Sequence, residues 1–136
     1  MPDPQPSGEV ESNEVVARHC IRASEHMRRG DPARQERPRG KYPLFLPFPR
    51  TELSVVRVSG LATSEIRAIG VDHVCPDVKG HACVMATAVL DCLGLSFDAN
   101  GEPYPRHANV IGWSGIEPKD RLHAKKLADA SELVEY

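Results

Sequence analysis

The alternation of hydrophobic and polar residues predicts regular structure mainly in the last two thirds of the chain. Residues 53–59 (LSVVRVS) are rich in β-branched side chains and predict a strand, with Leu53 and Val55 on one face. Residues 81–93 (HACVMATAVLDCL) are apolar almost throughout and stop at Gly94, which predicts a buried central helix. The other predicted elements are a short helix, two strands and a final helix, at 64–69, 95–99, 107–113 and 118–134.

Burial is expected along one face of each predicted helix. In the final helix, which Pro118 opens, we expect Leu122 and Leu127 to point inward, and in the central helix Leu90 and Leu93. The order strand, helix, helix, strand, strand, helix predicts an α+β fold, in which a small antiparallel sheet carries two or three helices on one face.

The N-terminal third has a different composition. Residues 1–12, made of proline, glycine, serine and acids, predict a disordered leader. Residues 13–29 fit either a helix or an edge strand, and the helix is slightly favoured. Repeated prolines in residues 31–50 predict an extended strap over the core, because proline removes backbone donors. Residues 51–136 are then the compact domain.

Charge is sorted along the chain, whose net charge is −2. Residues 18–50 hold nine bases against three acids, whereas residues 51–136 carry a net negative charge. Arginine suits bidentate contact with carboxylate or phosphate, and aromatic rings nearby can stack on bases. The candidate partner-binding residues are Arg28, Arg29, Arg34, Arg37, Arg39, Tyr42 and Arg50.

Several alternatives remain open for this basic segment. It can bind an acidic protein surface, contact nucleic acid, neutralise the acidic domain of its own chain, or serve as a solvated linker. A protein partner is favoured over nucleic acid because the chain as a whole is not basic.

Metal and thiol chemistry are not expected. Potential ligands lie within a span of 33 residues, but their spacing lacks the close pairs that pre-organise a zinc site. Without a secretion signal the four cysteines should be free thiols, and neighbouring His73 and Cys75 are poorly placed for proton transfer. We therefore predict no metal and no cofactor. The potential metal ligands in this span are Cys75, His81, Cys83, Cys92 and His107.

Three polar residues are candidates for a cleft, namely Arg57, His81 and His107. We expect them to lie apart rather than to converge on one site. The glycines of residues 112–115 lack the lysine and helix that a phosphate-binding loop requires. The sequence thus contains no recognisable catalytic set.

Two short motifs carry a resemblance. The first comprises Glu52, Leu53, Ser54, Val55 and Arg57, and the second His107, Ala108, Val110 and Gly112. In this layout the chain resembles small bacterial proteins with an ELSVxR-type strand followed by an HAxVxG-type strand, which have no assigned activity. The resemblance implies a bacterial accessory protein made beside the partner it serves, and it implies no catalytic residue or cofactor.

These patterns together predict a cytoplasmic, non-enzymatic accessory or interaction module that binds a protein partner through its arginine-rich segment. A bacterial toxin–antitoxin or defence operon is a fitting context. The alternative is a small protein that binds or acts on nucleic acid, with its arginines on phosphates. No stretch is apolar over the roughly 18 residues that a membrane helix needs.

Overall fold

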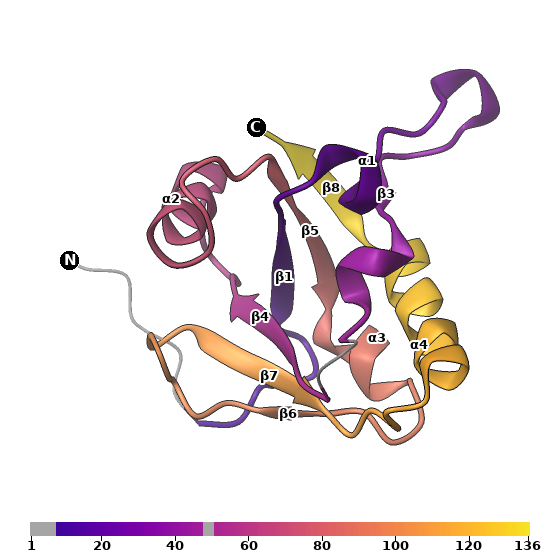
Figure 1. The fold of residues 1–136 in the computed structure, drawn as a ribbon. Helices are drawn as coiled ribbons and strands as arrows, with labels where there is room; N and C mark the ends of the chain where they lie inside the picture. Colours follow the sequence, from indigo (N-terminus) through magenta and orange to yellow (C-terminus); the bar gives the residue numbers. More distant parts are fainter. Residues whose placement is uncertain (1–7, 48–50) are drawn as a thin grey trace.

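The computed structural model describes residues 8–47 and 51–136. Six strands form one antiparallel sheet in the order β6-β7-β4-β1-β5-β8 (Figure 1). With the helices that pack on it, this sheet makes the α+β fold that the sequence predicts. The strands are β1 (Val15–Cys20), β4 (Leu53–Arg57), β5 (Gly80–Met85), β6 (Ser96–Asp98), β7 (His107–Ile111) and β8 (Glu132–Glu135).

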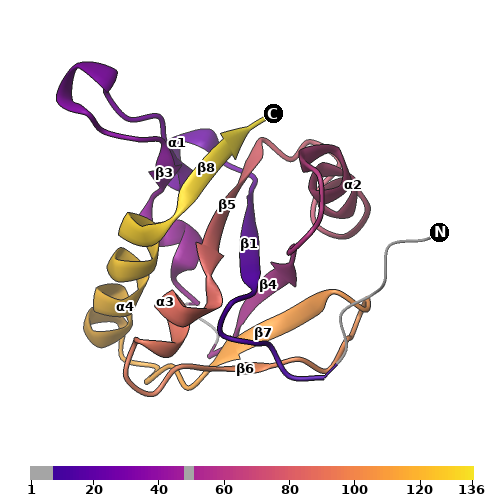
Figure 2. The same ribbon diagram turned by 180° about the vertical axis from the view of Figure 1, so that it is seen from behind.

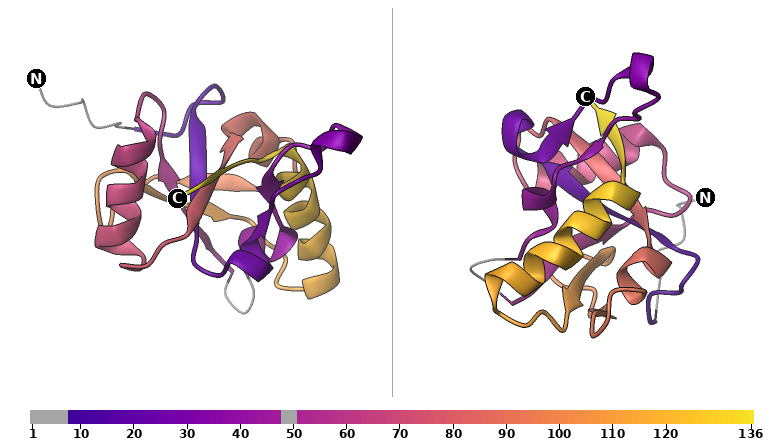
Figure 3. Two further views of the ribbon diagram at one scale, coloured as in Figure 1. Left: turned by 90° about the horizontal axis from the view of Figure 1, so that it is seen from above. Right: turned by 90° about the vertical axis from the view of Figure 1, so that its right-hand side faces the viewer.

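The helices lie on both faces of the sheet, whereas the sequence predicted them on one. Helix α2 (Thr63–His73) covers one face, and α4 (Glu117–Ala130) covers the other (Figures 2 and 3). The central strands explain this division, because successive side chains of a strand point to opposite faces. Val16 and Ala17 of β1 are both buried and belong to different hydrophobic clusters, so each face needs its own cover.

Strand β1 shows that the helix favoured for this part of residues 13–29 is wrong, and that the strand is central rather than at the edge of the sheet. It lies in the middle of the sheet, with Val16 opposite Arg57 of β4 on one side and opposite Val84 of β5 on the other. A central strand is buried on both faces and reads as a short apolar run. The sheet therefore includes β1, which precedes residue 51, as well as strands that follow it.

The central helix predicted for residues 81–93 is wrong. Residues 80–85 form β5, and only Ala86–Leu90 continue as the short helix α3. Ala82 and Val84 face α4, while His81 and Cys83 face α2. An apolar run of this kind fits a two-sided strand as well as a buried helix, and periodicity alone does not separate them.

The last helix is shorter than the sequence predicts. It ends at Ala130, and β8 follows as an edge strand beside β5. The helix buries Ala124, Leu127 and Ala128, but Leu122 is 63% exposed, which overturns the expectation for that residue. Leu90 and Leu93, expected inside the core, are exposed as well.

The segment before β4 packs on the sheet beside α4. It contains the short helices α1 (Ala23–His26), η1 (Pro32–Arg34) and η2 (Tyr42–Phe45) and a two-stranded ribbon, β2 (Met27–Arg28) and β3 (Arg39–Gly40). Leu44 and Phe45 are fully buried in the core. Residues 48–50 of the expected strap and residues 1–7 of the leader lie outside the described residues.

In the described part of the chain, no helix combines the length and apolar character needed to cross a membrane.

Candidate functional site

The arginine-rich residues 22–45, which end with η2, form a folded arm. The ribbon pairs Met27 with Gly40 and Arg28 with Arg39, and the loop between its strands projects from the body (Figure 1). Gly30 allows the turn after β2, because it has a positive φ and a side chain there would collide with the backbone of Glu36 and Arg37. The arm therefore holds its arginines at defined positions.

Two sets of hydrogen bonds fix the arm to the sheet and to α4. The Arg18 guanidinium donates from Nε to the Leu44 carbonyl and from Nη1 to the Ser54 carbonyl, both at 2.9 Å. Burial lowers the pKa of Arg18. The Ser131 hydroxyl, at the end of α4, accepts from the Gly40 amide at 2.8 Å. Through these bonds the arm is tied to β1, β4 and α4.

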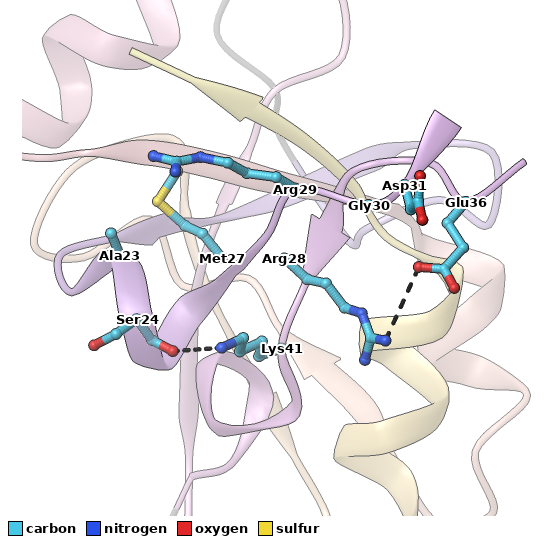
Figure 4. Close-up of a pocket in the computed structure, with 9 residues that line it drawn as sticks. All are labelled: Ala23, Ser24, Met27, Arg28, Arg29, Gly30, Asp31, Glu36 and Lys41. Atoms are coloured by element: carbon cyan, nitrogen blue, oxygen red, sulfur yellow. Dashed lines mark hydrogen bonds and ion pairs between the residues drawn. The ribbon is translucent and has the colours of Figure 1, made fainter. Parts of the chain in front are cut away.

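The first groove lies on the arm and has a volume of about 670 Å³. Arg28 and Arg29 leave neighbouring positions of the chain and point away from each other (Figure 4). Arg28 lies 4.0 Å from Glu36, and Lys41 donates to the Ser24 carbonyl at 2.6 Å. The groove is thus lined by bases and acids side by side.

The second groove adjoins the first and has a volume of about 390 Å³. It shares Ser24, Arg28 and Lys41 with the first groove. Its other wall is helix α4, which supplies Lys125 and Asp129. We call these two depressions the arginine grooves.

Tyr42 and Arg39 also line the second groove. The charged ends of Arg121 and Lys125 lie 5.6 and 5.7 Å from the centre of the Tyr42 ring, within the range of cation–π attraction. The ring is thereby engaged by its own chain. Arg39 lies 3.8 Å from Asp129, and its side chain is only 21% exposed.

The other predicted arginines are placed differently. Arg29 pairs with Glu135 of β8 at 2.6 Å, and Arg34 with Asp31 at 3.7 Å. Arg37 donates to the backbone carbonyls of Asp129 and Ser131. Arg34 and Arg37 line neither arginine groove, and Arg50 lies outside the described residues.

Several of these arginines thus face carboxylates of their own chain, as one of the alternatives proposed. Exposed ion pairs contribute at most about 1 kcal/mol each, because water screens them. Arg28 and Arg29 remain 53% and 76% exposed, so a partner can compete for both.

The three polar cleft candidates do not share a site within the described residues. Arg57 is buried and forms a two-point ion pair with Glu14. His81 is also buried and hydrogen-bonds the hydroxyl of Tyr136 through Nδ1 at 2.6 Å. Burial lowers the pKa of His81 to about 4, so its ring is neutral. Both contacts link elements of the fold.

His107 lies in a third depression of about 830 Å³, on the α2 side of the sheet. Its Nε2 lies 2.5 Å from the hydroxyl of Ser54, and burial lowers its pKa. A hydroxyl beside a neutral imidazole is the first requirement of nucleophilic catalysis. Among the described residues, however, Nδ1 of His107 is buried and has no hydrogen-bond partner, so none of their carboxylates orients the ring as a triad requires. The contact between Ser54 and His107 links β4 to β7.

Tyr104 covers the same depression. Its ring stacks on His73, with centroids 4.1 Å apart, and meets His107 edge-on. Burial raises the pKa of Tyr104 to about 12. This aromatic cluster closes the sheet face beside α2.

The cysteines are free thiols. Burial raises the pKa of Cys20 to about 12 and that of Cys83 to about 11, which keeps both protonated and unreactive. Within residues 8–47 and 51–136, no three His, Cys, Asp or Glu side chains gather in a way that could hold a metal ion.

Sequence reasoning missed the contribution of α4. Lys125 and Asp129 complete the second groove although they are about 85 residues from Tyr42 in the chain. No local pattern marks them, because lysine and aspartate on a helix ordinarily face water. Only the docking of η2 against α4 brings them to the arm.

Comparisons with protein-family models, with curated proteins and with solved structures found no match to this chain. Its function is therefore inferred from the residues themselves.

Proposed function

We propose that this protein is a non-enzymatic interaction module that binds an acidic segment of a protein partner along the arginine grooves. The observation that carries the proposal is the shape of the arm. It is anchored by hydrogen bonds to β1 and to the end of α4, and it holds Arg28, Arg29 and Lys41 around two adjoining grooves. A segment held in place loses little conformational freedom when it binds, which favours affinity.

The mixture of charges favours a protein over nucleic acid. Five bases line the arginine grooves, but four carboxylates lie among them, namely Glu25, Asp31, Glu36 and Asp129. A phosphate backbone presents only negative charge and is repelled at each of these carboxylates. A protein segment can place its own acids and donors to match both signs.

The engagement of Tyr42 points the same way. An aromatic ring that stacks on a nucleotide base needs an open face. The charged ends of Arg121 and Lys125 already approach the ring of Tyr42. The Tyr42 ring, which in the sequence suggested stacking on a base, thus already has cation–π contacts within its own chain.

The test compares two double variants with the same change of charge. Arg28→Ala with Lys125→Ala removes two bases of the second groove, and Arg34→Ala with Lys79→Ala removes two bases outside both grooves. Binding is measured by fluorescence anisotropy with a labelled glutamate-rich peptide and a labelled single-stranded DNA. The groove variant should weaken peptide binding roughly tenfold, equivalent to about 1.4 kcal/mol, and the control much less.

Equal losses in the two variants would show that only net charge matters, and the proposal would fail. Preferential binding of the DNA, with an affinity that falls steeply as salt rises, would assign the grooves to nucleic acid instead.

A further inference from the structure

The exposed leucines of α4 and its neighbouring loop form an apolar depression beside the arginine grooves. Leu122 is 63% exposed and Leu93 is 92% exposed, and both line a groove of about 490 Å³. Single exposed leucines are common on protein surfaces, but two that line one hollow make a patch. We call it the leucine groove.

The fold itself turns Leu122 outward. At the start of α4, the buried carboxylate of Asp120 accepts hydrogen bonds from the amides of Ser114 and Gly115 and from the Ser114 hydroxyl, at 2.8 to 3.0 Å. Asp120, Ala124 and Leu127 therefore face inward, three or four residues apart. Leu122 lies on the opposite side of the helix and cannot join them.

Lysines surround the leucine groove. One stripe of α4 carries residues three or four positions apart that line this groove, namely Lys119, Leu122, Lys126 and Asp129. Lys125 lies beside this stripe. Three lysines thus face a single carboxylate at the rim. This combination complements a segment that carries apolar residues on one side and acids on the other.

The leucine groove is continuous with the second arginine groove, because Lys125 and Asp129 line both. One extended surface therefore runs from the arm across α4. A partner segment that lies in the arginine grooves can reach the leucines without leaving the surface.

We infer that the leucine groove receives the apolar face of an acidic amphipathic helix of the partner protein. This inference rests on the proposed function and names the chemistry of the partner. Leucine-type side chains of that helix, three or four residues apart, enter between Leu93 and Leu122. Its glutamates or aspartates face Lys119, Lys125 and Lys126. Nucleic acid offers no row of leucine-type aliphatic side chains spaced three or four residues apart to enter this groove.

The test uses synthetic peptides of about 18 residues, long enough to form a helix alone. One peptide places leucines on a single helical face and glutamates elsewhere. A second has the same composition with its leucines spread around the helix, and a third replaces the glutamates with lysines. Binding to the intact protein is measured by fluorescence anisotropy.

Leu122→Ala and Leu93→Ala are the informative variants, because both side chains are exposed and their loss leaves the core intact. Val71→Ala is the matched control, since Val71 is 39% exposed on α2, on the other side of the sheet. Each leucine variant should weaken binding of the acidic amphipathic peptide roughly tenfold, the loss typical of an anchoring side chain. The Val71 variant should bind like the unmodified protein.

Equal affinity for the amphipathic and the spread-leucine peptide would overturn the inference and leave the proposed function in place, provided that Arg28→Ala with Lys125→Ala still weakens both. Equal affinity for the lysine peptide would also overturn it. Dimerisation of the free protein that Leu122→Ala abolishes, measured by sedimentation velocity, would assign the groove to a second copy and refute the inference.

Discussion

The buried ion pair between Arg57 and Glu14 gives the sharpest test of how the N-terminal residues are held. Nε of Arg57 lies 2.8 Å from Oε1 of Glu14, and Nη2 lies 2.7 Å from Oε2. The same guanidinium donates to the carbonyls of Gly8 and Glu9. The side chains of Arg57 and Glu14 are only 4% and 13% exposed. The pair therefore fastens residues 8–14 to β4.

The substitution Glu14→Gln keeps the shape of the side chain and removes its charge. Breaking a buried pair by removing one partner costs about 3 to 5 kcal/mol, because the other charge stays buried and unpaired. Glutamine retains one acceptor and Glu14 is slightly exposed, so we expect a loss of about 3 kcal/mol in the free energy of unfolding. For a chain of this size that lowers the melting temperature by about 10 °C.

Urea denaturation followed by circular dichroism measures this loss. The control is Glu25→Gln, which removes a carboxylate from the exposed pair with Arg22 and should cost less than about 1 kcal/mol. Replacing both partners with apolar residues, as Arg57→Met with Glu14→Leu, should cost less than Glu14→Gln, because no charge remains buried.

The pH dependence supplies a second measurement on the same pair. The hydrogen bonds from Arg57 hold the pKa of Glu14 below its usual value of 4.5. A carboxylate with a lowered pKa in the folded state stabilises the protein above pH 4.5, and this contribution is lost as the pH falls further. Glu14→Gln should abolish that part of the acid sensitivity. A cost of Glu14→Gln below about 0.5 kcal/mol would refute the reasoning, since values of that size are typical of surface positions.

Three further predictions concern His81, Phe45 and Gly112. The pKa of His81 is lowered from 6.5 to about 4 by burial, so the stability that its neutral form maintains above pH 6.5 is lost as the pH falls towards 4. Between pH 7.5 and pH 5.0 the unmodified protein should lose about 2 kcal/mol more than His81→Gln in urea denaturation, and equal losses would contradict this. Phe45→Ala should cost about 3 to 5 kcal/mol by the same assay, because the ring is 1% exposed; a small cost would show that η2 is not part of the core. Gly112→Ala should cost more than about 3 kcal/mol, since φ is +95° and the new Cβ would strike the Gly94 carbonyl oxygen. Gly60→Ala, with φ of +82° and open space around it, should cost about 1 kcal/mol, and an equal cost at both glycines would exclude the collision.

Local sequence determined the elements whose signals are short-range. The β-branched run from Leu53 predicted β4, and the strand predicted for residues 107–113 contains β7, because β-branched and apolar residues in a short run mark a strand locally. The short helix predicted for residues 64–69 is present, but α2 continues past Gly70 to His73, since glycine is tolerated within a helix.

Tertiary structure decided what depends on a neighbouring element. Strands β1 and β5 look like helices in the sequence, because each is covered on both faces and lacks an alternating pattern. The inward side of α4 follows from the buried Asp120, which a sequence reading places in water and which turns Leu122 outward.

The candidate surface divides in the same way. Sorting of charge along the chain singled out Arg28, Arg29 and Arg39 as candidates, and these three side chains line the arginine grooves. It could not show that Lys125 and Leu122 lie on the same surface as these arginines, because contacts between residues more than 80 positions apart depend on how α4 packs against η2. The sequence shows where charged residues lie along the chain, whereas the packing of α4 against the arm decides which charged side chains lie close together.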